Sequence, residues 1–405
     1  MSARDVYVLD GLRTPRGKAS PRGALASLSA LTLARAVLAG LRERAPALPT
    51  LAEDVILGCA TQVDGQGTNL ARTAVLLEGF GDHVPGVTIN RFCASGIDAV
   101  NFGAAKILAG QAGLVIAGGV ESISSVPMFA DRGPLYTDPA VMSQIGTVHM
   151  GISADFVATR EGFSRGELDA YALRTRAKAR AAHSAGRGRA SIVAPRRADG
   201  QSACDRDELL SFAPTADELA ALPPAFLELG EQGQDAVILG RNRGVSRVEH
   251  RHTRASSPPL ADAAAMLVLS DRETAARCGL RARARIVRAA SVAVDPVVML
   301  TAGQLAAERV LALEGLAPSD VSVFEFAEAF SALSLKFQRD FGLDDERLNP
   351  NGGTLALGHA FGATGAILLI NAIDELERIG GRFAVAAVSG AAGLGVATLI
   401  ERVES

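Results

Sequence analysis

The chain has 405 residues, and its 41 Lys and Arg residues against 44 Asp and Glu residues give a formal net charge of −3 at pH 7. That length allows two or three domains, or one large pseudo-symmetric unit, with a sizeable buried core. A composition of 48% hydrophobic and 21% charged residues excludes wholesale disorder, and the near-neutral charge excludes a generally basic nucleic-acid-binding protein.

Short runs rich in β-branched residues alternate with Ala- and Leu-rich helical segments, a pattern typical of parallel α/β architecture. The first third of the chain predicts a strand over Val6–Leu9, a helix over Leu31–Glu43, a strand over Asp54–Gly58, a helix that begins near Asn69, a strand over Val87–Ile89, a helix over Ile97–Leu108 and a strand over Leu114–Ala117.

The segment from about 122 to 250 has few strand-like runs but contains helical stretches such as Arg165–Ala182. It predicts a helical loop domain folded over one face of the sheet. The α/β pattern resumes at Ala261–Leu269 and at Ala284–Val294. The uncharged stretch Phe383–Ile400 is long enough for a membrane helix, but three glycines interrupt it, so we expect two buried strands joined by a Gly-rich loop and no membrane span.

A short sequence pattern occurs once in each half of the chain. Gly96 follows Ala and Ser at the start of a predicted helix, and a strand opens 18 residues later at Leu114. Gly365 follows Ala and Thr at the start of another helix, and a strand opens 18 residues later at Phe383. This repeated loop–helix–strand unit predicts two similar α/β halves. We place the N-terminal half, with the loop domain, at 1–270 and the C-terminal half at 271–405.

The cysteines indicate a reduced setting and single out one thiol. Cys59, Cys93, Cys204 and Cys278 form no CxxC pair and have no His at metal-ligand spacing, so we expect no disulfide framework, no metal site and a cytoplasmic location. Cys93 alone stands between a short strand and a helix, among small residues that allow a tight turn. Because a helix N-terminus favours negative charge, we expect a lowered pKa at this thiol and a nucleophilic role.

His359 is the candidate partner of Cys93. Glycines flank it on both sides, and the helix that follows offers free N–H groups. An imidazole there can activate a thiol or donate a hydrogen bond to a developing oxyanion. Four further histidines stand in polar surroundings, which predicts surface positions: His83, His183, His250 and His252.

With these motifs in order, the chain resembles the thiolase family over nearly its whole length. The opening Val8-Leu-Asp-Gly-Leu-Arg-Thr-Pro15 matches the first strand and turn of that family, and Asn90-Arg-Phe-Cys-Ala-Ser-Gly96 matches its nucleophile motif. The segment around His359 is close to the family's GHPxGATG. Ala327-Glu-Ala-Phe330 occupies the place of NEAF, and Ser389-Gly-Ala-Ala-Gly-Leu-Gly395 that of the Gly-rich C-terminal loop, which carries a Cys in the family.

The resemblance implies a fold and a mechanism. The fold is a five-layered α-β-α-β-α duplication with a helical loop domain. In the mechanism, Cys93 takes the acyl group of an acyl thioester, His359 promotes its attack, and the backbone N–H groups of Cys93 and Ala391 stabilise an oxyanion. The resemblance also implies that the substrate is contacted by His149, Met150, Ser257, Phe330 and Phe361.

Departures from the family pattern concern the second half-reaction and the carrier. Ala327 replaces the NEAF Asn that holds an oxyanion water, and Ser389 replaces the second catalytic Cys, which moves the α-carbon proton of acetyl-CoA. An unactivated hydroxyl is a much poorer proton carrier than a thiol of pKa about 8.5. Pro258 stands where the family has a Ser that contacts the pantetheine arm, and Ala360 replaces the Pro of GHP, so the carrier is either coenzyme A or an acyl carrier protein.

We therefore expect an acyltransferase that uses a Cys-bound acyl intermediate in Claisen-type carbon–carbon bond formation or cleavage. Two alternatives remain open: a specialised acyltransferase to a non-enolate acceptor in a biosynthetic pathway, and a catalytically silent subunit that binds acyl groups or a partner. We expect a coenzyme A thioester as substrate, with an acyl-carrier-protein thioester as the alternative, and no bound cofactor. The resemblance also implies a homodimer or homotetramer.

Overall fold

The computed structural model describes residues 5–404, which form one mixed sheet of ten strands. Nine strands lie in the order β4-β3-β5-β6-β1-β7-β10-β9-β8, and β2 pairs with β6. The strands are β1 (Val6–Arg13), β2 (Gly17–Lys18), β3 (Asp54–Gly58), β4 (Gly86–Ile89), β5 (Leu114–Glu121), β6 (Ala261–Ser270), β7 (Ala284–Ala293), β8 (Val321–Phe326), β9 (Phe383–Ser389) and β10 (Leu394–Arg402).

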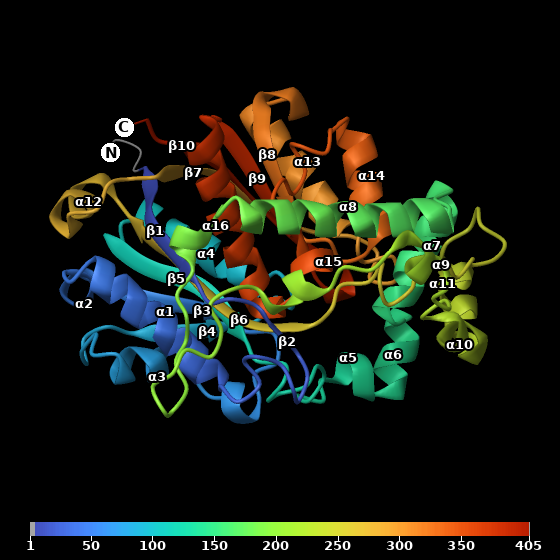
Figure 1. Cartoon of the computed structure of the whole chain (residues 1–405), viewed down its shortest axis with the longest axis horizontal. Helices are drawn as coiled ribbons and strands as arrows, with labels where there is room; N and C mark the ends of the chain where they lie inside the picture. The colour runs from blue at the N-terminus through green and yellow to red at the C-terminus, as the bar shows by residue number, and fades with distance from the viewer. Residues whose placement is uncertain (1–4, 405) are drawn as a thin grey trace.

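Sixteen α-helices connect and cover these strands within the described residues (Figure 1). They are α1 (Ala30–Arg44), α2 (Leu48–Leu51), α3 (Leu70–Leu77), α4 (Ser95–Leu108), α5 (Pro134–Thr137), α6 (Pro139–Ile145), α7 (Met150–Glu161), α8 (Arg165–Ser184), α9 (Ala216–Ala220), α10 (Leu227–Leu229), α11 (Asp235–Arg241), α12 (Arg272–Cys278), α13 (Ala302–Glu314), α14 (Ser331–Phe341), α15 (Thr354–Leu357) and α16 (Phe361–Ile379).

The elements stack in five layers, as the resemblance implies. Helices α1 and α3 pack on one face of the half-sheet β4-β3-β5-β6-β1, and α13 and α14 cover the half-sheet β7-β10-β9-β8 from the opposite outer side. Helices α4 and α16 contact each other and lie between the two half-sheets. Three hydrophobic clusters fill the spaces between these layers, and the central cluster contains most of the apolar residues of α4 and α16.

Most of the predicted elements are confirmed. Helix α3 begins after Asn69, whose side chain caps it by accepting from the N–H of Arg72, and β3 has the predicted bounds. The stretch 383–400 forms β9 and β10 around a short 3-10 turn at Ala391–Gly393, and no described helix is long and apolar enough to cross a membrane.

The first strand is longer than predicted. It continues through Asp10 to Arg13. The buried Asp10 carboxylate accepts hydrogen bonds from the N–H of Gly11 and from Arg44, which is 3.0 Å away. Because this acid has partners, it does not end the strand.

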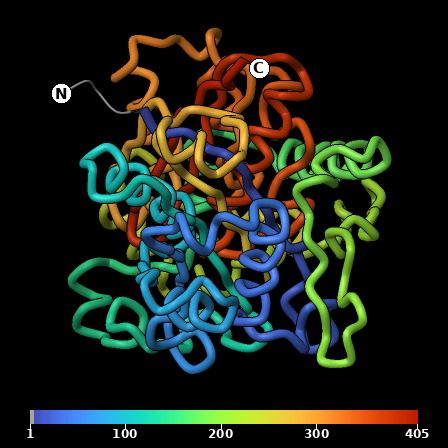
Figure 2. Tube along the Cα trace, turned by 90° about the vertical axis from the view of Figure 1, so that its left-hand side faces the viewer, coloured from blue at the N-terminus to red at the C-terminus, as the bar shows by residue number. Residues whose placement is uncertain are grey.

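The segment between β5 and β6 is helical, as expected for the loop domain. It contains α5 to α11, and Figures 1 and 2 show it at the periphery of the molecule, with α8 running across the C-terminal half. Helix α8 begins with a capping box in which Ser164 and Glu167 satisfy each other's backbone N–H groups. This segment contacts the layered core through α7 and α8, which pack against α14, and through α15, which packs against α8.

Candidate active site

Cys93 lies in the turn between β4 and α4, and side chains on both sides hold that turn. The Asn90 Oδ1 accepts from the N–H of Phe92 at 2.8 Å. The Ser95 hydroxyl accepts from the N–H of Arg91 at 2.8 Å and donates to the carbonyl of Phe92 at 2.6 Å. Phe92 adopts a φ of 50°, which is strained for a residue with a side chain. The turn is therefore rigid and presents the residue after Phe92 outward from the strand end.

His359 lies in the corresponding turn before α16. Its Nδ1 is 2.8 Å from the Oγ1 of Thr364, and that oxygen also accepts from the N–H of Ala360 at 3.1 Å. The contact at Nδ1 leaves Nε2 as the ring atom available to a substrate. Phe361, two residues after His359, has a φ of 27° and places its ring edge-on to the imidazole, with centroids 5.1 Å apart.

Small residues bring the two turns together. A Cβ on Gly96 would lie 2.2 Å from the carbonyl oxygen of Gly362, and a Cβ on Gly119 would lie 1.9 Å from the same oxygen. The buried carboxylate of Glu121, at the end of β5, accepts from the N–H of Gly362 at 3.0 Å and from that of Ala60 at 2.8 Å. The N-terminal ends of α4 and α16 are thus tied to the same strand ends.

Both turns open into one cavity of about 160 Å³ between the core and the loop domain. It is lined by Cys93, Met128, His149, Met150, Phe226, Ser257, Pro258, Leu260, Leu300, Ala329, Phe330, His359, Phe361, Ser389, Gly390 and Ala391. The structure thus brings together nine of the ten residues that the sequence predicts for the site. The tenth, Ala327, lies at the end of β8, donates its N–H to the carbonyl of Ala387 at 2.9 Å and does not line this cavity.

A second cavity of about 260 Å³ borders Cys93 from the side of the loop domain. It shares Cys93, Met128, Met150, Phe361 and Ala391 with the first cavity. Its remaining walls come from Ala60, Thr61, Asn90, Phe92, Phe129, Asp131, Gly133, Pro134, Leu135 and Tyr136. The thiol therefore stands where two cavities meet.

The predicted lowering of the Cys93 pKa is wrong. Burial raises the pKa of this thiol to about 12, and the negative charge of Glu121 contributes in the same direction. Cys93 lies two positions before the first residue of α4. The removal of water from the thiol by the surrounding protein raises its pKa by more than the N-terminal end of the helix lowers it. Burial also lowers the pKa of His359 to about 4. The resting pair is therefore a neutral thiol and a neutral imidazole.

Ser389 is fixed by structural hydrogen bonds. Its hydroxyl donates to the carbonyl of Leu300 at 2.7 Å and accepts from the N–H of Gly303 at 2.9 Å. Gly303 belongs to the first turn of α13, where backbone N–H groups lack helical partners. The Ser389 hydroxyl therefore anchors the start of α13, and its only hydrogen is already committed.

Two backbone N–H groups at the cavity have no partner elsewhere in residues 5–404. The N–H groups of Cys93 and Ala391 donate to no other residue of the described chain. Ala391 opens the 3-10 turn between β9 and β10, where Ala392 adopts a φ of 55°. This strained turn leaves the N–H of Ala391 free beside the cavity that also contains the thiol.

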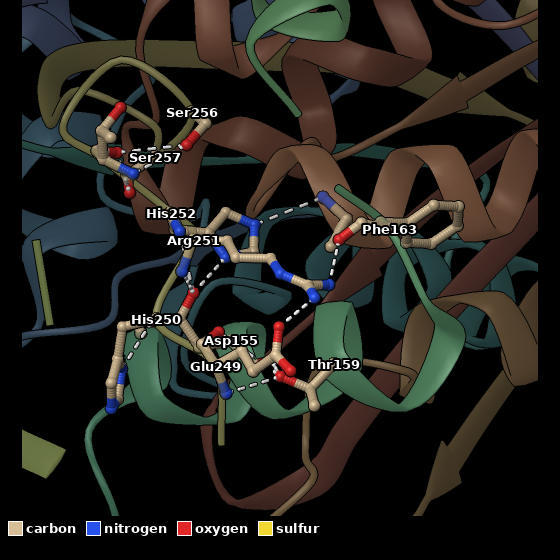
Figure 3. A network of polar contacts seen from close by, with 12 residues as sticks. Asp155, Thr159, Phe163, Glu249, His250, Arg251, His252, Ser256 and Ser257 are labelled. Carbon is tan, nitrogen blue, oxygen red and sulfur yellow. Dashed lines mark hydrogen bonds and ion pairs between the residues drawn. The ribbon is translucent and has the colours of Figure 1, made fainter. Parts of the chain in front are cut away.

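The expectation that His250 and His252 are surface residues is wrong. Figure 3 shows Asp155, on α7, between them: its carboxylate is 3.0 Å from Nδ1 of His250 and 2.8 Å from Nδ1 of His252, and the latter side chain is fully buried. The hydrogen bond to Asp155 raises the pKa of His250. Burial alone would raise the pKa of Asp155, but its hydrogen bonds from both imidazoles leave it lowered.

This network links α7 to the loop that carries Ser257. The His252 ring lies edge-on to Phe330, with centroids 5.4 Å apart, and Phe330 lines the first cavity. Ser257 donates to the carbonyl of Thr253 at 2.8 Å. The polar residues beside these histidines in the sequence suggested exposure, but the partners that bury the two rings, Asp155 and Asp235, lie on α7 and α11.

Several site residues were not predicted from the sequence. Phe226 and Met128 come from the loop domain, where no periodic pattern distinguishes a wall residue from any other apolar side chain. Thr364 does stand inside the motif around His359 that carries the resemblance. Its role as an anchor could have been inferred, because it is a polar residue beside a predicted elbow.

Comparisons with known proteins agree with this architecture. Residues 6–232 match the family model of the thiolase N-terminal domain, and residues 280–402 match that of the thiolase C-terminal domain. The chain is 37% identical over 423 aligned residues to the β-ketoadipyl-CoA thiolase of Pseudomonas knackmussii, covering 99% of this chain and 100% of that protein. It is 32% identical to the steroid 3-ketoacyl-CoA thiolase FadA6 of Mycobacterium tuberculosis, covering 98% and 94%.

The solved structures include a close match in fold. The crystal structure of the Bacillus anthracis acetyl-CoA acetyltransferase superimposes with a TM-score of 0.86 at 32% identity, covering 99% of both chains. The five layers, the paired elbows of Cys93 and His359 and these matches lead to one conclusion. The chain belongs to the thiolase family and is an acyltransferase of the Claisen type.

Proposed function

We propose that the chain transfers acyl groups from coenzyme A thioesters through a thioester on Cys93, with His359 as the base. The observation that carries this proposal is the meeting of the two elbows at one cavity. Cys93 and His359 come from equivalent positions in the two halves, and the same cavity borders both side chains. A nucleophile and a base held by separate rigid turns are the minimum for covalent acyl transfer.

The protonation states suit a coupled attack. Because the thiol and imidazole are both neutral at rest, the thiol must lose its proton as it attacks the thioester carbon. The Nε2 of His359 takes that proton and returns it to the departing coenzyme A sulfur. In this mechanism the Thr364 oxygen accepts from the Nδ1–H, which leaves Nε2 unprotonated for the base step. Nδ1 keeps that hydrogen while the protonated ring acts as an acid.

The free N–H groups of Cys93 and Ala391 form the proposed oxyanion hole. Each lies beside the position where a thioester oxygen acquires charge as the thiol attacks. Removing one such donor typically slows a reaction by about 10²–10³-fold. A gain of that size can offset the strain of the turn that keeps the Ala391 N–H unpaired, and such strain is common at active sites.

For the second half-reaction we propose acyl transfer to the enolate of an acetyl thioester, or its reverse. The relatives act on β-ketoadipyl-CoA and steroid 3-ketoacyl-CoA, as their names state, and we extend only the 3-ketoacyl thioester class to this chain. Coenzyme A is the proposed carrier, with His149, Met150, Ser257, Phe330 and Phe361 in contact with it or with the acyl group. The chemistry requires no bound cofactor.

A second candidate function follows from the state of Ser389. Its hydroxyl is committed to Leu300 and Gly303, so it is not a free proton carrier. Ala327 supplies no side-chain donor for an oxyanion water. These two positions favour transfer of the Cys93 acyl group to an acceptor that needs no α-proton removal, such as an amine, an alcohol or water.

The edge of the sheet supports at least a homodimer. Strand β4 ends the sheet with an unpaired side, and Val87 on it is 41% exposed. Leu76 and Leu77 on α3, which packs against β4, are 47% and 52% exposed. We propose that a second copy of the chain covers this edge, and sedimentation velocity tests the proposal.

Exchange of acetyl-CoA α-protons with deuterated water separates the two candidate functions. Slow exchange is expected in the unaltered protein, even where Cys93 accepts acyl groups readily. Ser389→Cys combined with Ala327→Asn should accelerate exchange and the cleavage of acetoacetyl-CoA. The double change is needed because base and oxyanion hole act on one transition state. Rapid exchange by the unaltered protein that survives Ser389→Ala would contradict a limiting role for Ser389.

A further inference from the structure

The second cavity has the size and the chemistry of a pocket for an uncharged acyl chain. Its volume is about 260 Å³, and it begins at the Cys93 thiol. A cavity of about 150 Å³ holds a benzene molecule, so this one accommodates a phenyl ring or a chain of about six carbons. The acetyl group alone would leave most of the cavity empty.

The walls are mainly apolar: Thr61, Asn90 and Tyr136 are neutral polar residues, and Asp131 is the one charged exception among the described residues. Phe92, Met128, Leu135 and Phe361 are among the lining residues. The Phe129 and Tyr136 rings pack against each other with centroids 4.4 Å apart. No Lys, Arg or His is among the residues, all within the described chain, that line this cavity.

The exception is Asp131, an exposed residue of the segment that precedes α5. Tyr136 lies close to both Asp131 and Cys93: burial raises the pKa of its phenol, and the negative charges of the thiolate and of the Asp131 carboxylate add to that rise. The Cys93 thiol, the Tyr136 phenol and the Asp131 carboxylate therefore border the same cavity.

We propose that this cavity receives the acyl chain of the Cys93 thioester, an inference that rests on the proposed role of Cys93. The cavity selects uncharged acyl chains over chains that end in a carboxylate, such as adipyl. A terminal carboxylate in the cavity would lose water, find no cation among the walls and lie near the negative charge of Asp131. An alkyl or phenyl chain carries no charge and meets mainly apolar walls.

The step that fixes this choice is the acylation itself. The Cys93 sulfur forms a bond to the acyl carbon, the bond from that carbon to the coenzyme A sulfur breaks, and the thiol proton passes through His359 to the leaving sulfur. The acyl chain must lie in the second cavity if the coenzyme A arm occupies the first, because both cavities border the thiol.

The test measures the rate of Cys93 acylation by intact mass, with hexanoyl-CoA, phenylacetyl-CoA and adipyl-CoA as donors. Hexanoyl and phenylacetyl groups should transfer at least about 100-fold faster than adipyl, given the penalty for an unpaired charge. Asp131→Arg should raise the adipyl-to-hexanoyl rate ratio about 10-fold, and Asp131→Asn should raise it about threefold. Asp82→Arg, which changes the same charge at an exposed site outside the cavity, should leave the ratio unaltered.

Two results would overturn the inference in distinguishable ways. Equal rates for adipyl and hexanoyl donors, with a ratio unaffected by Asp131→Arg, would refute charge selection by this cavity while leaving the Cys93 thioester intact. Absence of an adduct with all three donors would refute the Cys93 thioester itself, and the acyl role of the cavity with it.

Discussion

The close approach of α4 and α16 leads to a strong prediction, because it sets the positions of the proposed nucleophile, Cys93, and the proposed base, His359. Replacing Gly96 by Ala places a methyl group 2.2 Å from the carbonyl oxygen of Gly362, whereas ordinary contact begins near 3.4 Å. That oxygen belongs to the backbone at the start of α16, so it cannot rotate away as a side chain could. The two helices must separate by roughly 1 Å to accept the substitution.

The expected cost has a structural and a catalytic part. Overpacking in a well-filled core typically destabilises a protein by about 1–3 kcal/mol. A misplacement of about 1 Å between reacting groups can cost about 10²-fold in rate. Gly96→Ala should therefore lower stability by about 1–3 kcal/mol and slow Cys93 acylation by about 10²-fold, although neither reactive side chain has changed.

The assay combines chemical denaturation with the time course of Cys93 acylation by intact mass. Gly166→Ala is the matched control, since Gly166 lies near the start of α8 with nothing within 4 Å of its added Cβ. That variant should be neutral or up to about 1 kcal/mol more stable, because Ala is the better helix former. A Gly96→Ala protein with unaltered stability and acylation rate would refute the argument that this helix contact sets the site geometry.

The remaining predictions concern titrating groups. His359→Ala should slow acylation by roughly 10² or more, measured by rapid quench, and a near-normal rate would leave only a structural role for the loop. Glu325 is fully buried, and this burial, together with the smaller effect of the negative charge of Glu375, raises its pKa to about 8. The folded chain thus retains a proton that the unfolded chain releases above about pH 4, so stability falls as pH rises toward 8. Glu325→Gln should stabilise by roughly 1–3 kcal/mol at pH 8 and little at pH 5 in denaturant titrations; an equal effect at both would contradict this.

The sequence predicts the layered core because its signals are local. Buried strands such as β3 and capped helices such as α3 are determined by residues within one or two turns of the chain. The duplication also predicts that Cys93 and His359 occupy equivalent elbows, since the same small-residue turn precedes α4 and α16. These features require no knowledge of distant contacts.

Other features depend on contacts between distant segments and could not be predicted. The pKa of Cys93 is raised by protein that surrounds it and by Glu121 at the end of another strand, whereas the helix end suggested the opposite shift. His252 is buried because Asp155, nearly a hundred residues earlier, accepts its hydrogen bond. Ser389 was predicted as a replaced catalytic position, but its anchoring of α13 depends on where Gly303 lies.

The acyl-enzyme mechanism depends on one event, the acylation of Cys93, and peptide mass spectrometry detects it. The protein is incubated with hexanoyl-CoA and acetyl-CoA, quenched in acid, digested and examined by mass spectrometry. The peptide that contains Cys93 should carry the acyl group, peptides with Cys59, Cys204 and Cys278 should not, and Cys93→Ala should abolish the adduct. Turnover of the donor with an unmodified Cys93 peptide, or an adduct that persists in Cys93→Ala, would contradict the acyl-enzyme mechanism.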